Sequence, residues 1–410
     1  MGIILASNDD NNIMGFLKIS LFFLVLVGLN PDLNSIRVLW WGIVLFAIVN
    51  MLIVIVKKDL PVVNQFFIWM LAFFFWGTLS YFWSLYFAIT FEILKTLLIN
   101  LLVFWLISCV IITEVDIYAL FKIIVYATTL NGIYILYKID VGLLGTTQIG
   151  ADLLGEMWNG NTIGIMMAFG VLISLLLISK EETRLKKIRY IIIIVVSTLI
   201  VILTGSRKAL FFVVFGYVAF TGLSSKSNRI LLMTKIIIIL ALGYQLIMNI
   251  PLFYSILGVR IEGLFSIVTG LGAVDSSTEL RIEYIDYGLS WFMDKPIFGY
   301  GLDNYRVLLY RAIGKGTYSH NNYIELLVGV GVIGTIIYYY AFGYVLLNAR
   351  KLLKASKEPM TYLIVVIMVA ILISQYGFVT YYDFMVNLII CISFIVVRTK
   401  LKEDKTLSVK

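Results

Sequence analysis

Residues 319–325 read Ser-His-Asn-Asn-Tyr-Ile-Glu, and the apolar segment LLVGVGVIGTIIYYYAFGYVLL follows at 326–347. An apolar run of roughly 20 residues can cross a bilayer as a helix. His320, at the polar entrance of this run, is the only histidine in the chain. Histidine is the side chain best suited to moving a proton near neutral pH. The stretch therefore indicates both a membrane fold and a candidate site.

The rest of the chain has the same apolar character. Hydrophobic residues make up 61% of it and charged residues 14%. Most apolar residues fall in runs of spanning length, so we expect an all-α polytopic membrane protein with about twelve transmembrane helices. The predicted spans lie near residues 14–30, 36–56, 62–83, 91–112, 116–137, 159–179, 188–204, 209–223, 230–250, 321–347, 361–380 and 384–397.

Lysine and arginine collect on one side of the membrane if these spans simply alternate. That side should be cytoplasmic, which places both termini inside the cell. The positive groups on that side are Lys57-Lys58, the run from Lys180 to Arg189, Lys226 with Arg229, the run from Arg350 to Lys357, and the tail from Arg398.

The net charge of +8 would suggest nucleic acid in a soluble protein. Here the cations sit in short loops facing anionic lipid, so we expect membrane lipids and no nucleic acid as partners. Cys109 and Cys391 lie inside apolar runs without ligand spacing, which predicts no disulfide and no metal site. The first span has no small-residue cleavage site after it, so it should be a retained anchor.

Two segments are predicted on the outer side. The glycine-rich loop 138–158 should form a flexible, partly ordered cover. Residues 251–320 form the large polar loop, in which 276–279 has the pattern of a capping box. Apolar residues then recur at helical spacing over 280–293, and Pro296 ends the pattern, so we expect a short amphipathic helix at the outer interface.

Arg207 and Lys208 mark a second candidate site. By alternation of the spans, residues 204–208 form a tight outer turn, where the topology rule disfavours cations. This observation supports two interpretations equally. The side chains of Arg207 and Lys208 serve a functional site, or they extend to lipid phosphates from a helix end. Arg281 by itself favours a solvated helix face, since acidic neighbours on the same helix could pair with it.

The glycines after His320 match a dinucleotide-binding pattern literally, as Gly329-x-Gly331-x-x-Gly334. They lie within a predicted span and no strand precedes them, so the match is chance. Small residues in a membrane helix let a neighbouring element approach closely.

These motifs together resemble the O-antigen polymerase and ligase family, bacterial membrane enzymes of surface polysaccharide assembly. His320-Asn321, nine residues and then Gly331-x-x-Gly334 is similar to the family's H-N-x9-G-x-x-G pattern. Thr204-Gly205-Ser206-Arg207 at an outer turn, Arg281, and the segment from Pro296 to Tyr305 extend the resemblance. It covers about residues 190–345 in motif terms. The remaining N-terminal half is similar only in being a bundle of spans.

The resemblance implies transfer of a glycan from a polyprenyl-diphosphate carrier to an acceptor hydroxyl on the outer face, with no cofactor and no metal. Arg207 and Arg281 would hold the diphosphate, because arginine binds phosphate oxygens in a bidentate fork. His320 would take the proton from the attacking hydroxyl. The expected substrate-binding residues are Ser206, Lys208, Tyr305, Asn321, Asn322 and Glu325.

The resemblance also sets the expected organisation and partners. An N-terminal transmembrane bundle (1–187) should precede a catalytic region (188–347) that includes the outer loop, and C-terminal helices with a cytoplasmic tail (348–410) should follow. The expected location is the bacterial cell membrane. The expected partners are the lipid-linked oligosaccharide donor and acceptor, with a chain-length regulator and a flippase as accessory proteins.

Three functions fit this pattern. A polymerase for O-antigen, capsule or exopolysaccharide is preferred over a ligase, because the asparagine after the histidine and the glycine spacing resemble the polymerase pattern more. A ligase that moves the glycan to another acceptor uses the same chemistry. A flippase or transporter would usually show repeated halves, and no such repeat is visible.

Overall fold

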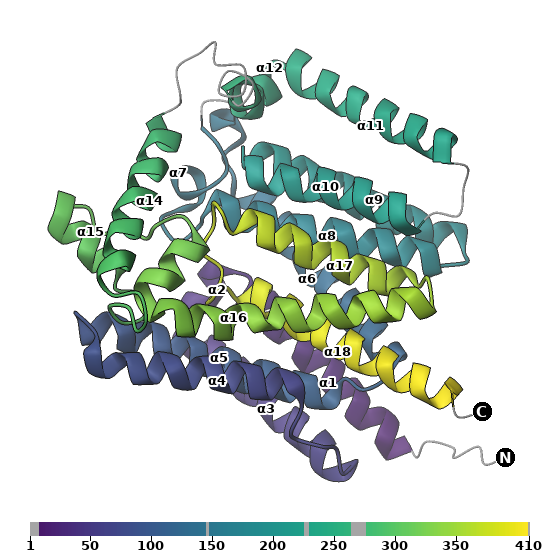
Figure 1. Ribbon diagram of the computed structural model, residues 1–410. Helices are drawn as coiled ribbons and strands as arrows, with labels where there is room; N and C mark the ends of the chain where they lie inside the picture. The colour runs from purple at the N-terminus through teal and green to yellow at the C-terminus, as the bar shows by residue number, and fades with distance from the viewer. Residues whose placement is uncertain (1–7, 145–146, 225–228, 264–275, 409–410) are drawn as a thin grey trace. The chain divides into compact units, whose positions relative to one another are not determined.

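The computed structural model describes residues 8–144, 147–224, 229–263 and 276–408, and its regular elements are helices (Figure 1). The chain divides into two compact units. Unit 1 comprises Met1–Val62, Val110–Leu264 and Lys357–Val366, and unit 2 comprises Val63–Cys109, Phe265–Ser356 and Ile367–Lys410. Residues 63–109 thus belong with the C-terminal half of the chain by their contacts, and the predicted functional regions 1–187, 188–347 and 348–410 stay a prediction.

Unit 1 contains the helices α1 (Asn8–Gly28), α2 (Pro31–Ser35), α3 (Arg37–Lys57), α6 (Glu114–Lys138), η2 (Val141–Leu143), α7 (Ala151–Leu154), α8 (Gly160–Lys180), α9 (Arg184–Leu203), α10 (Arg207–Ser224), α11 (Arg229–Asn249), α12 (Pro251–Phe253) and the π-helical turn η3 (Tyr254–Gly258). Unit 2 contains α4 (Gln65–Ser80), η1 (Tyr81–Trp83), α5 (Phe87–Val110), α14 (Ser276–Asp294), α15 (Tyr305–Ile313), α16 (Asn322–Ala355) and α18 (Phe384–Ser408). The helix α17 (Pro359–Ser374) has residues in both units.

Each of the predicted spans overlaps a described helix, which confirms the all-α polytopic membrane fold. In the part of the chain that the structure describes, nine helices are long and apolar enough to cross a membrane, and α1 and α17 carry shorter apolar stretches. The remaining predicted span, at 188–204, falls in α9, whose first turns are strongly basic. The count of about twelve spans therefore stays a prediction.

The core of unit 1 is α8, which packs against α6, α9 and α10. Almost every residue from Ile163 to Ser174 is buried, as expected for a helix that is apolar on all sides. Glycines allow the close packing: a Cβ on Gly170 would lie 2.7 Å from Thr128 Oγ1, and one on Gly164 would lie 2.5 Å from Ala209 Cβ.

The core of unit 2 is α16, which packs against α4, α14 and α18. The helix breaks at Gly331, where the backbone takes φ 65° and ψ −172°. Tryptophans of α4 bind carbonyls around this break: Trp76 Nε1 donates to Val330 O at 3.0 Å, and Trp69 Nε1 donates to Ile337 O at 2.9 Å. The break is therefore a fixed feature of the packing.

The segment before α15 lies against the break in α16. Tyr300 N donates to Val328 O at 2.8 Å, Gly301 N donates to Gly329 O at 2.9 Å, and Val332 N donates to Pro296 O at 2.8 Å. These bonds satisfy backbone groups that a kinked helix leaves unpaired. The small residues of α16 thus allow a loop, as well as a neighbouring helix, to pack closely against it.

The predicted amphipathic helix is α14, and its Tyr284 and Trp291 pack into a cluster with Tyr305, Leu309 and Ile324. Leu280, expected on the same apolar side, is exposed. The side chains of 276–278, and with them the proposed capping box, lie outside the described residues.

Candidate functional site

The loop that carries His320 belongs to unit 2. Three non-glycine residues in the described part of the chain have positive φ, and two of them are His320 (φ 57°) and Asp303 (φ 63°). Such a conformation costs of order 1–3 kcal/mol and persists only where the surroundings enforce it. Both residues therefore mark a place where the fold imposes a backbone geometry.

The surroundings of His320 form a clamp made by Ser319, Asn321 and Glu325. The carboxylate of Glu325 accepts the Ser319 N–H at 2.8 Å, and Ser319 Oγ donates to the Asn321 carbonyl at 2.7 Å. Asn321 Oδ1 accepts from Tyr323 N at 2.9 Å and from Ile324 N at 3.2 Å, so it caps α16. The histidine is thus held between two fixed residues at the start of a buried helix.

The side chain of His320 is half-buried between two tyrosines. The ring of Tyr318 is 4.2 Å away, centroid to centroid, and the ring of Tyr284 is nearly parallel to it at 6.2 Å. Tyr284 belongs to α14, and its carbonyl accepts the hydroxyl of Tyr305 at 2.6 Å. The helix α14, the helix α15 and the histidine loop therefore meet at Tyr284.

Arg281 lies on α14 three residues before Tyr284, and residues at this spacing share a helix face. Its side chain is half-buried. The resemblance implied that Arg281 and His320 serve one site, and in unit 2 the ring of Tyr284, one helical turn after Arg281, lies against His320. The combination offers a guanidinium and an imidazole with aromatic walls, which suits an anionic ligand with a sugar attached.

An ion pair that the sequence analysis did not assign lies in the same loop region. Arg306 Nη2 contacts Asp303 Oδ1 at 2.9 Å, and Tyr381 OH lies 3.5 Å from the same oxygen. Burial raises the pKa of Asp303, while the charge of Arg306 acts in the opposite direction. The i,i+3 spacing of the pair was the sequence signal, but the spacing could not reveal that Asp303 is only 6% exposed.

Asn304, next to Asp303, ties this loop to the start of α5. Its Nδ2 donates to Thr90 Oγ1 at 2.7 Å and to Ser84 Oγ at 2.8 Å, and its Oδ1 accepts from Tyr86 N at 2.9 Å. The segment 300–304 is therefore anchored on one side by α16 and on the other by α5.

Three residues expected to bind sugars have protein partners instead. Asn322 Oδ1 accepts from Thr380 N at 2.8 Å, and the residue is fully buried. Tyr305 is also fully buried, and Glu325 is 1% exposed. Glu325 holds the histidine loop, Tyr305 holds α15 to α14, and Asn322 holds the chain before α18, so each supports the fold. Their assignment to substrate stays a prediction.

The turn that carries Arg207 belongs to unit 1. Gly205 has φ 60°, which suits glycine, and a Cβ there would lie 3.0 Å from Gln148 Oε1. Ser206 Oγ donates to Asn161 Oδ1 at 2.8 Å and accepts from Ala209 N at 3.3 Å. Ser206, another expected substrate-binding residue, thus caps α10 and is only 3% exposed.

Arg207 and Lys208 are the first two residues of α10, and both are half-buried. The N-terminus of a helix carries partial positive charge, so cations there are unfavourable unless an anion is near. Arg260, which the sequence analysis missed, adds to the charge: its Nη1 donates to Gly205 O at 3.1 Å. Its place just beyond the predicted span 230–250 was the available signal.

The predicted outer loop 138–158 reaches this turn. Ile149 N donates to Leu203 O at 3.0 Å, and Trp158 is buried with its ring 6.3 Å from that of Tyr134. These contacts attach the loop to α9 and α6, and its role as a flexible cover stays a prediction. Among the described residues, no group of three or more His, Cys, Asp or Glu side chains is placed to hold a metal ion.

Comparison with protein-family models finds a match to the O-antigen ligase domain over residues 192–339. The matched range contains the Arg207 turn, α14 and the His320 loop. It confirms the resemblance that the motifs indicated. No curated protein gives a significant match to the chain.

Proposed function

Residues 192–339 match the O-antigen ligase family, and from this premise we propose that the protein polymerises lipid-linked oligosaccharides. The chain is a membrane enzyme of O-antigen-type polysaccharide processing, and its family acts on lipid-linked oligosaccharides. The proposed donor is a polyprenyl-diphosphate oligosaccharide on the outer face of the membrane. The proposed acceptor is a hydroxyl of a second lipid-linked unit.

In the proposed reaction the acceptor oxygen attacks the anomeric carbon of the donor. The bond between that carbon and the diphosphate oxygen breaks, and the diphosphate leaves with the electron pair. His320 accepts the proton of the acceptor hydroxyl, as a general base placed by the loop around it. Arg281, and separately Arg207 at the positive end of α10, bind diphosphate oxygens and stabilise the charge that grows on them.

The observation that carries the proposal is the conformation of His320. The backbone at the only histidine is left-handed (φ 57°), and the clamp and two flanking tyrosines hold the residue in this conformation. Strain of this kind concentrates at functional sites. Polymerase is preferred over ligase because the Asn321 that follows the histidine resembles the polymerase pattern.

The test uses the full-length protein in liposomes with one synthetic polyprenyl-diphosphate oligosaccharide as both donor and acceptor. We expect a ladder of products that differ by one repeat unit. In a parallel reaction that contains a different acceptor, transfer of the glycan to that acceptor without a ladder would assign the protein as a ligase. Movement of the lipid across the bilayer without any product would assign it as a flippase.

The arginines are tested in the same assay. Arg207→Ala and Arg281→Ala should each lose most activity while the protein still accumulates in the membrane. Lysine should restore only part of it, because an ammonium lacks the planar fork that matches a phosphate. Arg311→Ala, an exposed arginine on α15, is the control and should retain activity. Full activity of either alanine variant would remove that arginine from the site.

A further inference from the structure

We propose that the side-chain rings of Tyr318 and Tyr284 hold the imidazole of His320 in place and stabilise the positive charge that it gains when it accepts a proton. This role rests on the proposed function, in which His320 is the general base for the acceptor hydroxyl. It makes the two tyrosines positioning residues, one from the histidine loop and one from α14. Neither the sequence motifs nor the family match gives either tyrosine a part in the reaction.

Tyr318 lies directly against the imidazole. The two ring centroids are 4.2 Å apart, and the ring planes are inclined by 49°. The peptide that joins Tyr318 to Ser319 is fixed, because its N–H donates to the carboxylate of Glu325 at 2.8 Å. Ser319 Oγ in turn donates to the Asn321 carbonyl at 2.7 Å. The clamp that holds the backbone of His320 therefore also holds the backbone from which the Tyr318 ring extends.

Tyr284 approaches the imidazole from α14. Its ring is nearly parallel to that of His320, at an angle of 13° and a centroid distance of 6.2 Å. Tyr284 is 5% exposed and belongs to the core cluster that includes Ile324 of α16. One turn later, a Cβ on Gly288 would lie 2.2 Å from Ile324 Cγ2, so α14 packs closely against α16 at this level. The position of the Tyr284 ring is thus set by the core of unit 2.

An aromatic ring distinguishes the two charge states of a neighbouring imidazole. The face of the ring carries partial negative charge, so it attracts a cation within about 6 Å of its centroid and attracts a neutral group much less. Tyr318 lies well inside this range and Tyr284 lies at its edge. In the proposed reaction the imidazole becomes a cation while the acceptor hydroxyl loses its proton. The attraction therefore grows toward the transition state, which is the condition under which an interaction accelerates a reaction.

Charged and titratable groups of the neighbouring elements also lie near the histidine loop. They are Arg281 on α14, Asp303 and Arg306 at the start of α15, Glu325 on α16, and Tyr382 before α18. An arginine disfavours an imidazolium, and a carboxylate favours it. Burial raises the pKa of Tyr382, and the charges of Glu325 and Asp303 raise it further. All of these groups are retained when one tyrosine ring is replaced, so a change in the titration of His320 reports on that ring.

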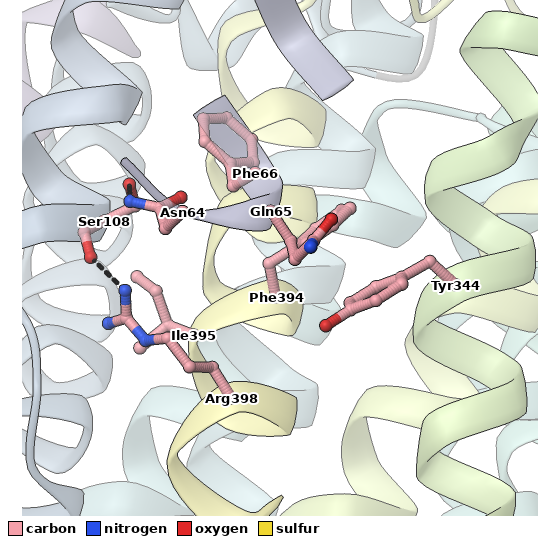
Figure 2. Close-up of a pocket in the computed structure, with 8 residues that line it drawn as sticks. All are labelled: Asn64, Gln65, Phe66, Ser108, Tyr344, Phe394, Ile395 and Arg398. Carbon is pink, nitrogen blue, oxygen red and sulfur yellow. Dashed lines mark hydrogen bonds between the residues drawn. The ribbon is translucent and has the colours of Figure 1, made fainter. Parts of the chain in front are cut away.

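The guanidinium of Arg398 does not belong to this set. Figure 2 shows it in a small pocket, where Arg398 Nη1 donates to Ser108 O at 2.7 Å. The cavity holds about 30 Å³, room for little more than a water molecule. Tyr344, which lines the same pocket, lies roughly 30 Å along α16 from Asn322. At such a distance the charge of Arg398 is screened from the histidine loop.

The single histidine of the chain gives a test that needs no activity assay. Histidine-selective isotope labelling of the full-length protein, purified with a tag that contains no histidine, yields one imidazole NMR signal that is followed with pH. Loss of the ring in Tyr318→Leu should move the midpoint to lower pH by about 0.4–1.5 units, equivalent to about two- to thirtyfold in the protonation equilibrium. Tyr318→Phe keeps the ring and should leave the midpoint in place. Tyr310→Leu, at an exposed position on α15, is the control and should also leave it in place.

The same variants are then compared by single-turnover transfer in liposomes. In Tyr318→Leu the plateau rate should fall by up to about thirtyfold, and the acid limb of the pH profile should move to lower pH together with the NMR midpoint. A purely structural loss of activity would lower the rate and leave the acid limb in place. In a His320→Gln background, Tyr318→Leu should have little further effect, because the charge that the ring stabilises no longer forms.

A midpoint that stays in place in Tyr318→Leu, or that moves equally in Tyr318→Phe, would overturn the proposal. Tyr318→Trp supplies the ring that attracts cations most strongly, and it serves if the leucine variant does not fold. It should move the midpoint upward, and a downward shift would contradict the role of the ring. If the midpoint moves as expected but His320→Gln keeps near-full turnover, the tyrosines still stabilise the imidazolium, and the general-base step of the proposed function is what fails.

Discussion

His320 combines a strained backbone with a half-buried ring, and its replacement should separate chemistry from binding. His320→Gln keeps hydrogen-bonding capacity but cannot act as a base. We expect turnover to fall on the order of 10²–10⁴, the usual scale for a lost general base. Donor binding, measured by isothermal titration with an unreactive lipid diphosphate, should change much less. Near-full turnover of His320→Gln would leave the histidine as a hydrogen-bonding residue only.

Glu325 is assigned to positioning, because its carboxylate holds the Ser319 N–H and is itself buried. Glu325→Gln retains a carbonyl oxygen that can accept the same bond, so it should keep most activity. Glu325→Ala removes the acceptor and should lower turnover by about 10²-fold, the scale of a misplaced catalytic group. A direct role of the charge in the reaction would instead make both variants equally inactive.

Asp303 predicts a dependence of stability on pH. Its pKa is raised by burial in the folded protein, so the folded state takes up a proton more readily than the unfolded chain. Stability should therefore rise as the pH falls through the raised pKa, and should level off below the pKa that Asp303 has in the unfolded chain. Burial raises the pKa of Asp383 as well, so Asp303→Asn should make the dependence of the melting temperature on pH shallower without abolishing it. An unchanged slope in Asp303→Asn would assign the dependence to other groups.

Among the helices, the break in α16 at Gly331 should have the largest effect on stability when it is altered. A side chain at Gly331 would meet the carbonyl of Ile297 and would require a positive φ. We expect Gly331→Ala to cost about 1–3 kcal/mol from backbone strain, with a further loss from the clash. Loss of activity should accompany it, because α16 begins at the histidine loop.

Gly343 on the same helix provides the matched control for Gly331. No atom lies within 4 Å of an added Cβ there. Gly343→Ala should therefore be neutral or stabilising by up to about 1 kcal/mol, from helix propensity alone. Thermal unfolding of both variants in the same detergent checks the pair. Equal stability of the two would mean that the break tolerates a side chain.

The elements also show what sequence alone could provide. Apolar runs predicted the long helices other than α14, because a membrane span requires a long stretch of apolar chain, and helical spacing of apolar residues predicted α14. The glycines of α16 predicted close packing but not the break, which depends on the segment around Pro296. The partners of Asn322, Tyr305 and Glu325 could not be predicted either, because they are backbone groups that the fold brings near. The assignment of those side chains to sugars came from their chemistry, which suits a backbone amide equally well.

The whole molecule has a predicted orientation that labelling can check. We expect cysteines at Glu262 in unit 1 and Lys315 in unit 2, both exposed, to react with an impermeant thiol reagent on intact cells once any outer barrier is opened. A cysteine at Arg350 should react only after the membrane is permeabilised. Cys109 and Cys391 are buried and should remain silent. Ser206, in the Arg207 turn, is too buried to serve as a reporter.

Opposite labelling of the cysteines at Glu262 and Lys315 would contradict the proposed orientation. If only one of them reacts in intact cells, the two segments lie on different faces and the family's chemistry cannot use both. If Arg350→Cys reacts first, the orientation is inverted. The cysteine variants are compared at equal expression, with the wild type as the unlabelled reference.

The backbone bonds between residues 296–301 and α16 have a consequence for the synthesis of the protein. A broken helix with unpaired carbonyls is costly in hydrocarbon unless protein groups satisfy them. Here the satisfying segment precedes α16 in the chain, so it leaves the ribosome before the helix that needs it. The partner is thus already made when α16 enters the membrane, and insertion of the irregular span need not wait for any later part of the chain. A circular permutation that reversed this order would make the same contacts in the finished protein but would deprive the nascent helix of its partner.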